Sequence, residues 1–214
     1  MTPTLEATTD ELPRGKFLSV VGIDGSGKST LLRRVAQTHR SIRLLHWQEF
    51  EAVTRIQEQL GAPAATAPEV LHLLGPHSRA GLLSYIASLE YELVIEPTVA
   101  AGSSVIVDSY WYKFVAKMLV AGAAAPTLLP ACQALPPPDG VFFLEIDPER
   151  AYLRKEHVNF FEANGPREEF PAFQRGVQAE MLRLLSNVPV TVVDATLPVD
   201  TVYRLFEEFA GIDV

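Results

Sequence analysis

Five short apolar runs are spaced along the chain, and stretches with helical character separate them. The runs occupy residues 17–21, 42–47, 104–108, 141–147 and 190–194. Apolar runs without regular polar alternation are typical of strands that are buried on both faces. Strands that alternate with helices predict an α/β fold, in which helices cover both faces of a five-stranded parallel sheet.

The intervening stretches predict helices. The longest should cover residues 78–100 and bend at Pro97, because proline removes a backbone donor. Pro148 should open another helix, since proline costs little in a first turn. The other helices are expected at residues 31–40, 49–60, 69–74, 110–120, 128–134, 172–186 and 199–209.

Length and local composition divide the chain into a tail and one domain. A chain of 214 residues is long enough to bury a sizeable core. Residues 1–15 are polar and contain proline, which predicts a flexible tail. Residues 16–214 should then form a single domain. The charged segment 155–171 is broken by Asn-Gly-Pro at 164–166 and is a candidate for a short lid.

A net charge of −8 limits the kinds of partner that are expected. Nucleic-acid binders and proteins on anionic membranes present a basic face, so we expect no nucleic acid and no membrane partner. The single cysteine, Cys132, excludes an internal disulfide and is typical of a reducing cytoplasm. No apolar run is long enough to span a bilayer, and no signal-peptide pattern is found. We therefore expect a cytoplasmic location.

A phosphate-binding motif directly follows the first apolar run. Residues 22–30, Gly-Ile-Asp-Gly-Ser-Gly-Lys-Ser-Thr, fit the pattern G-x-x-x-x-G-K-[ST] at a strand-to-helix turn. Glycine lets the backbone wrap around a phosphate, and the helix N-terminus favours an anion. Lys28 adds charge near the β and γ phosphates, and the Ser29 hydroxyl is a ligand for Mg²⁺. The motif predicts a P-loop NTPase fold with an ATP site at Gly22, Gly25, Ser26, Gly27, Lys28, Ser29 and Thr30.

Three aspartates lie in the loop or at strand ends. Asp108 ends an apolar strand like a Walker-B acid that holds Mg²⁺; the alternative is an N-cap by Asp108 or Ser109. Asp147 precedes a proline and is interpreted as a helix cap. Asp24 lies within the loop, where a carboxylate is unfavourable unless it faces a hydroxyl, a metal or a cation. Contact with a second, acceptor substrate and a hydrogen bond that braces the loop are equally weighted for Asp24.

Several segments resemble the thymidylate kinase family. The phosphate loop after the first strand carries the most specific similarity, and the order of segments extends it over most of the chain. The other similar stretches are Ser78-Arg79-Ala80, Glu96-Pro97, Ala101-Gly102, residues 105–108, residues 144–149 and residues 192–195.

This resemblance implies roles for individual residues. Lys28 and Ser29 would bind ATP phosphates and Mg²⁺, and Asp24 would face the acceptor sugar or phosphate. Arg79 matches an arginine that contacts the acceptor nucleotide. Asp108 and Tyr110 match the first and third residues of the family's Asp-Arg-Tyr/Phe/His motif. The resemblance also implies a homodimer.

The lid is expected to supply positive charge, because the loop has no arginine. Family members of this kind carry basic lid residues instead. Arg150, Arg154, Lys155 and Arg167 are candidates, and we favour Arg154 and Lys155 as catalytic residues. The alternative for each is a solvated basic helix face.

Two departures from the family affect the acceptor site. Ser109 replaces the arginine of the Asp-Arg motif, and His46-Trp47-Gln48-Glu49-Phe50 replaces an Arg-Glu-Pro-Gly-Gly pattern. Lys113 and Arg55 are possible substitutes for the missing cations. Trp47, Phe50, Tyr110, Trp111 and Tyr112 are candidates for a base pocket, or for aromatic core.

Three functions follow. The favoured one is an ATP-dependent kinase that phosphorylates dTMP or a related monophosphate, which needs no general base because the acceptor oxygen is already anionic. The second is a deoxynucleoside kinase with Glu49 as the base that such a hydroxyl acceptor needs. The third is a catalytically idle nucleotide-binding relative, which the missing arginine allows.

Overall fold

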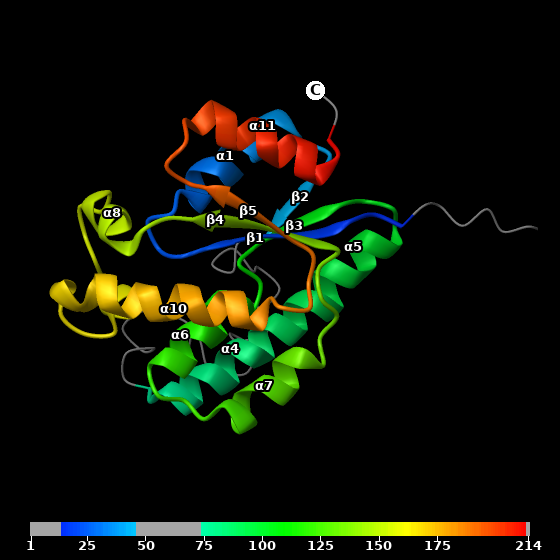
Figure 1. Cartoon of the computed structure of the whole chain (residues 1–214). Helices are drawn as coiled ribbons and strands as arrows, with labels where there is room; N and C mark the ends of the chain where they lie inside the picture. Colours follow the sequence, from blue (N-terminus) through cyan, green and yellow to red (C-terminus); the bar gives the residue numbers. More distant parts are fainter. Residues whose placement is uncertain (1–13, 46–73, 213–214) are drawn as a thin grey trace, which may run out of the picture.

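The five predicted strands form one parallel sheet in the order β2-β3-β1-β4-β5 (Figure 1). The computed structural model describes residues 14–45 and 74–212. The strands are β1 (Phe17–Gly22), β2 (Arg43–Leu45), β3 (Val105–Asp108), β4 (Gly140–Glu145) and β5 (Val190–Asp194). The prediction of a five-stranded parallel sheet is therefore confirmed.

Helices cover both faces of this sheet. On one face lie α1 (Lys28–Thr38) and α11 (Val199–Ala210), which contact each other (Figure 1). On the other face lie α4 (Pro76–Glu90), α6 (Tyr112–Val120) and α10 (Phe170–Leu184), and α7 (Ala125–Gln133) packs against α4. In the part of the chain that is described, no helix has the length and apolarity needed to cross a membrane.

The long helix predicted over residues 78–100 is interrupted one turn before its proline. The helix α4 passes into a π-helical turn at Tyr91–Ile95, and α5 (Glu96–Ala100) follows. Pro97 lies in the first turn of α5, where its missing donor matters least. The irregular turn that separates α4 from α5 therefore precedes Pro97.

The predicted helix over residues 110–120 begins two residues late. Ser109 and Tyr110 adopt positive φ angles of 67° and 44°, so α6 starts only at Tyr112. This turn directs Tyr110 into the hydrophobic core, where its ring packs edge-on against the ring of Phe17. The two ring centroids are 5.1 Å apart. The helices expected at 49–60 and 69–74 and the end of the run at 42–47 lie outside the described residues.

The central strands of the sheet are tightly packed. β1 lies between β3 and β4, and Val20, Val21, Phe142 and Phe143 of β1 and β4 are fully buried. Burying each such side chain contributes about 2 kcal/mol, before the entropy of ordering the chain is subtracted. The loops at the carboxyl ends of β1 and β3 are consequently anchored on well-packed strands.

The segment expected to be a lid follows α8 (Pro148–Leu153). It contains the short helix α9 (Phe160–Ala163) and a 3-10 turn (Arg167–Glu169), and it runs directly into α10. In Figure 1 this segment lies beyond the carboxyl end of β4.

Candidate nucleotide-binding site

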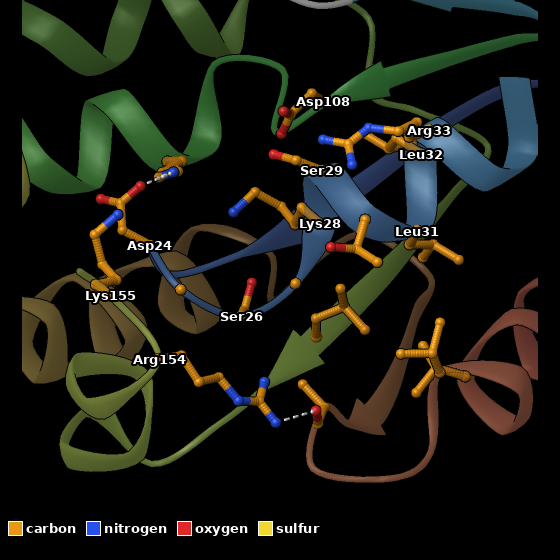
Figure 2. A pocket seen from close by; sticks show the side chains of 18 of the residues that line it. Asp24, Ser26, Lys28, Ser29, Leu31, Leu32, Arg33, Asp108, Arg154 and Lys155 are labelled. Atoms are coloured by element: carbon orange, nitrogen blue, oxygen red, sulfur yellow. Dashed lines mark hydrogen bonds and ion pairs between the residues drawn. The ribbon is translucent and has the colours of Figure 1, made fainter. Parts of the chain in front are cut away.

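A cavity of about 1170 Å³ opens at the carboxyl edge of the sheet. Its wall includes residues 24–30 of the phosphate loop, together with Asp108, Lys113, Arg154 and Lys155 (Figure 2). β1 lies between β3 and β4, and the chain crosses from one side of β1 to the other between β3 and β4, so the cavity sits where strand order reverses. Ligands of open parallel sheets bind at this position.

The glycines of the loop allow its tight path between β1 and α1. Gly25 has a φ of 79°, and a Cβ atom there would lie 2.7 Å from the carbonyl oxygen of Ala151. Gly27 has a φ of 96° and is the N-cap of α1, without a side chain to occupy the helix N-terminus. The loop therefore presents the amide end of α1 to the cavity, as an anion site requires.

Lys28 is buried at the base of this loop. Its Nζ donates to the carbonyl oxygens of Gly22 at 2.7 Å and Ile23 at 3.0 Å. Burial and, to a lesser degree, the charge of Lys113 lower the pKa of Lys28 to about 7 against the opposing effect of Asp108. A phosphate in the cavity would favour the charged ammonium, so Lys28 is suited to bind an anion.

Ser29 and Asp108 provide the oxygen atoms that Mg²⁺ prefers. The pairing of Val20 with Asp108 in the sheet places this acid beside the loop. The side chains of Ser29 and Asp108 both line the cavity. Figure 2 shows their oxygen atoms turned toward each other. Among the described residues, no group of three or more His, Cys, Asp or Glu forms a metal cage. The residues fit Mg²⁺, which nucleotide sites hold with few protein ligands plus phosphates and water.

The two strand-end aspartates have different hydrogen-bond partners. Asp147 caps α8, because its Oδ1 accepts from the amides of Glu149 at 2.9 Å and Arg150 at 3.3 Å. The N-cap of α6 is Trp111, which makes no side-chain capping bond. Ser109 instead donates its hydroxyl to Asp108 Oδ1 at 2.8 Å. The cap interpretation is thus confirmed for Asp147, whereas Ser109 does not cap α6.

Asp24 is held by three side chains from two helices. Lys113 Nζ lies 2.5 Å from its Oδ1, Lys117 Nζ lies 2.6 Å from its Oδ2, and Gln174 Nε2 donates to Oδ2 at 3.0 Å. Burial alone would raise the pKa of Asp24, but the charges of Lys113, Lys117 and Lys28 hold it well below its usual range. Asp24 is therefore an ionised brace between the loop, α6 and α10.

Gln174 and Lys117 were missed by the sequence analysis. Gln174 is fully buried on α10 and also donates to the carbonyl oxygen of Glu162 at 2.6 Å, which ties the phosphate loop to the candidate lid. A signal was present in the sequence. Gln174 is a polar residue within the apolar stripe formed by Phe170, Phe173, Val177 and Met181.

The predicted acceptor residues fall in different places. Arg79 is buried on α4 with its guanidinium 5.5 Å above the ring of Phe161, and its Nε has no hydrogen-bond partner in the described part of the chain. Tyr110 donates to the carbonyl oxygen of Pro136 at 3.4 Å and belongs to the core rather than to the cavity wall. Trp47 and Glu49 lie outside the described residues, as do Phe50 and Arg55.

The basic candidates of the lid divide into two groups. Arg154 and Lys155 line the cavity, where Arg154 donates to the carbonyl oxygen of Ala195 at 3.0 Å and Lys155 pairs with Glu162 at 2.8 Å (Figure 2). Arg167 donates to the Tyr152 hydroxyl at 3.1 Å and braces the segment internally. The two favoured residues are thus the ones that reach the cavity.

The chain is similar to known proteins over most of its length. A family model described as "Thymidylate kinase" matches residues 20–205. A thymidylate kinase of Xylella fastidiosa is 30% identical over 158 residues, which cover 71% of this chain and 70% of the relative. One from Xanthomonas campestris is 28% identical over 92% of this chain and 83% of its own length. A probable thymidylate kinase of Pyrobaculum calidifontis is 28% identical over 68% and 74%, respectively.

The geometry and these similarities agree. The cavity presents a phosphate loop, a buried lysine and two oxygen ligands at the switch point of a parallel sheet, and the family model spans all of them. The chain belongs to the thymidylate kinase family, and it is a phosphotransferase of the kinase type.

Proposed function

We propose that the protein transfers the γ-phosphate of ATP to the phosphate of dTMP or a closely related nucleoside monophosphate, with Mg²⁺ as the metal. The observation that carries the proposal is the joint position of Lys28, Ser29 and Asp108 on one cavity at the switch point of the sheet. Transfer between phosphates depends on positioning and on neutralising charge, and these residues supply both.

Each residue has a distinct part in this reaction. The loop amides and the N-terminus of α1 hold the phosphates of ATP. Lys28 adds a positive charge, and its attraction to the phosphates strengthens as negative charge develops in the transition state. Mg²⁺, when held by Ser29 and Asp108, neutralises charge between the phosphates. Arg154 and Lys155 would add positive charge from the lid, which excludes water when it closes.

The state of Asp24 supports a monophosphate acceptor over a nucleoside. A nucleoside hydroxyl needs a general base, whereas a phosphate oxygen does not. Asp24 is the carboxylate within the loop, but two lysines keep its pKa well below the usual range. A carboxylate stabilised as an ion in this way is a weak base, so the loop is poorly suited to activate a hydroxyl. The alternative base, Glu49, lies outside the described residues.

An acceptor screen tests this proposal. Purified protein with ATP and Mg²⁺ is offered nucleosides and nucleoside monophosphates in parallel, and ADP formation is followed with a coupled assay. We expect turnover with dTMP and none above background with thymidine. Turnover with thymidine alone would support the deoxynucleoside kinase, and background rates with every acceptor would support an idle relative.

The assembly and location are also proposals. We propose a homodimer, as in the family that the chain resembles, which light scattering of the purified protein would test. The buried free thiol of Cys132 supports a reducing, cytoplasmic location.

A further inference from the structure

Two lysines one turn apart on α6 share a single carboxylate. Lys113 and Lys117 both contact Asp24, and their side chains are only 18% and 12% exposed. Lys28 and Asp108 line the same region of the cavity. Two ammonium groups, those of Lys113 and Lys117, therefore share the one carboxylate of Asp24. A buried charge without a partner is unfavourable, so this cluster favours an additional anion.

Lys113 is the member of the pair that reaches the cavity. It lines the cavity wall together with Lys28, whereas Lys117 does not line it. The charge of Lys113 also lowers the pKa of Lys28. Lys117 contacts Asp24 without lining the cavity, and it neutralises part of the charge of that carboxylate. The charge of Lys113 is thereby left to face the cavity.

Lys113 lies four residues after the position at which the family-like arginine is missing. Ser109 occupies that position, and its hydroxyl is bonded to Asp108. The turn at Ser109 and Tyr110 is followed at once by α6, which carries Lys113 on its first turn. A cation is consequently retained at this end of α6, supplied from a different residue.

We propose that Lys113 binds the phosphate group of the acceptor, with Lys117 and Gln174 fixing Asp24 beside it. The inference rests on the proposed function and deepens it, because a cation at this point selects a phosphate monoester over a free nucleoside. Charge-assisted hydrogen bonds of this type are among the stronger ones in proteins.

Binding measurements test the inference independently of turnover. Isothermal titration with dTMP and with thymidine, without ATP, gives the contribution of the acceptor phosphate to affinity. We expect wild-type protein to bind dTMP about tenfold or more tightly than thymidine, and Lys113→Met to bind both alike. Lys113→Arg should retain the preference. Arg204→Met, which removes an exposed positive charge on α11, is the matched control for net charge.

Two outcomes would overturn the inference: a wild-type protein without preference for dTMP, and a Lys113→Met variant that keeps the preference. In the second case, the variant is also compared for its discrimination between ATP and ADP, which it would then lose if Lys113 served the donor. That loss would assign Lys113 to the donor's terminal phosphate. Should Lys113→Met fail to fold, Lys113→Gln replaces it, because glutamine keeps a hydrogen-bond donor without the charge.

The test separates this inference from the proposed kinase activity. A wild-type protein that phosphorylates dTMP, with a Lys113→Met variant of unchanged KM for dTMP, would leave the activity standing and remove only the role of Lys113. A wild-type protein that binds dTMP selectively but transfers no phosphate would remove the proposed activity and leave the role of Lys113 in binding.

Discussion

The side chain of Gln174 contacts both the backbone and the side chain of Asp24. The Asp24 amide donates to Gln174 Oε1 at 3.2 Å, and Gln174 Nε2 donates to Asp24 Oδ2 at 3.0 Å. The same Nε2 donates to the carbonyl oxygen of Glu162 at 2.6 Å. One fully buried amide thereby fixes the phosphate loop to α10 and to the candidate lid.

Replacing this amide should weaken both stability and turnover. Gln174→Leu leaves the Asp24 amide and the Glu162 carbonyl oxygen without this partner, and we expect the free energy of unfolding to fall by about 2 kcal/mol. Urea denaturation measures this change. Gln178→Leu, one turn further along α10, is the matched control, since Gln178 Oε1 has no hydrogen-bond partner in the described part of the chain. Equal effects of the two substitutions would contradict the bridging role of Gln174.

Lys28→Met should separate activity from stability. Lys28 is a buried ammonium that burial holds at a pKa of about 7, so its removal should leave the midpoint of thermal unfolding unchanged or raised. Loss of a contact that strengthens in the transition state should lower kcat by roughly 10²-fold or more. Thermal melting and initial rates with ATP and dTMP measure both effects. Near-normal turnover in this variant would be incompatible with phosphate binding by the loop.

Glu90 should make stability depend on pH. Burial, together with the nearby charge of Asp108, raises the pKa of Glu90 from 4.5 to about 8, and its Oε1 has no hydrogen-bond partner among the described residues. Between these pKa values the folded protein binds a proton that the unfolded chain releases. This group's contribution to stability therefore falls as pH rises from about 4.5 to about 8.

Glu90→Gln should remove that dependence. We compare the free energy of unfolding of the variant with that of the wild type at two pH values. The difference, variant minus wild type, should be roughly 3 kcal/mol larger at pH 8 than near pH 4.5. Glu92→Gln, on the exposed side of the same helical run, controls for the loss of a carboxylate. A difference between Glu90→Gln and wild type that stays constant with pH would refute the raised pKa.

The two strand-end aspartates should respond differently to substitution. Asp147→Ala removes the cap of α8 and should cost about 1 kcal/mol of stability, with kcat largely retained. Asp147→Asn keeps a capping oxygen and should restore the stability. Asp108→Asn should instead lower kcat and raise the Mg²⁺ concentration needed for half-maximal rate, because Asp108 is the proposed metal ligand. Magnesium titrations at fixed ATP measure this shift, and an unchanged titration would remove Asp108 from the metal site.

Local signals explain what the sequence predicted well. The five strands and the phosphate loop depend on neighbouring residues, namely apolar runs and glycines at a strand-to-helix turn, so both could be predicted without tertiary information. The cap at Asp147 likewise depends on the adjacent Pro148.

The residues around Asp24 depend on distant segments instead. Lys113 and Lys117 come from α6 and Gln174 from α10, and only the packing of those helices brings them to the loop. A surface lysine is the ordinary expectation for any single lysine on a helix. The positive φ angles of Ser109 and Tyr110 turn Tyr110 into the core. They could not be predicted from the sequence either, because neither residue is a glycine.

Product analysis distinguishes transfer of phosphate to dTMP from hydrolysis of ATP. The protein is incubated with ATP, Mg²⁺ and dTMP, and the nucleotides are separated by anion-exchange chromatography. We expect equal amounts of ADP and dTDP from the wild type, and roughly 10²-fold less of each from Lys28→Met in the same time. Formation of ADP with free phosphate and no dTDP, or equal product from both proteins, would contradict this expectation.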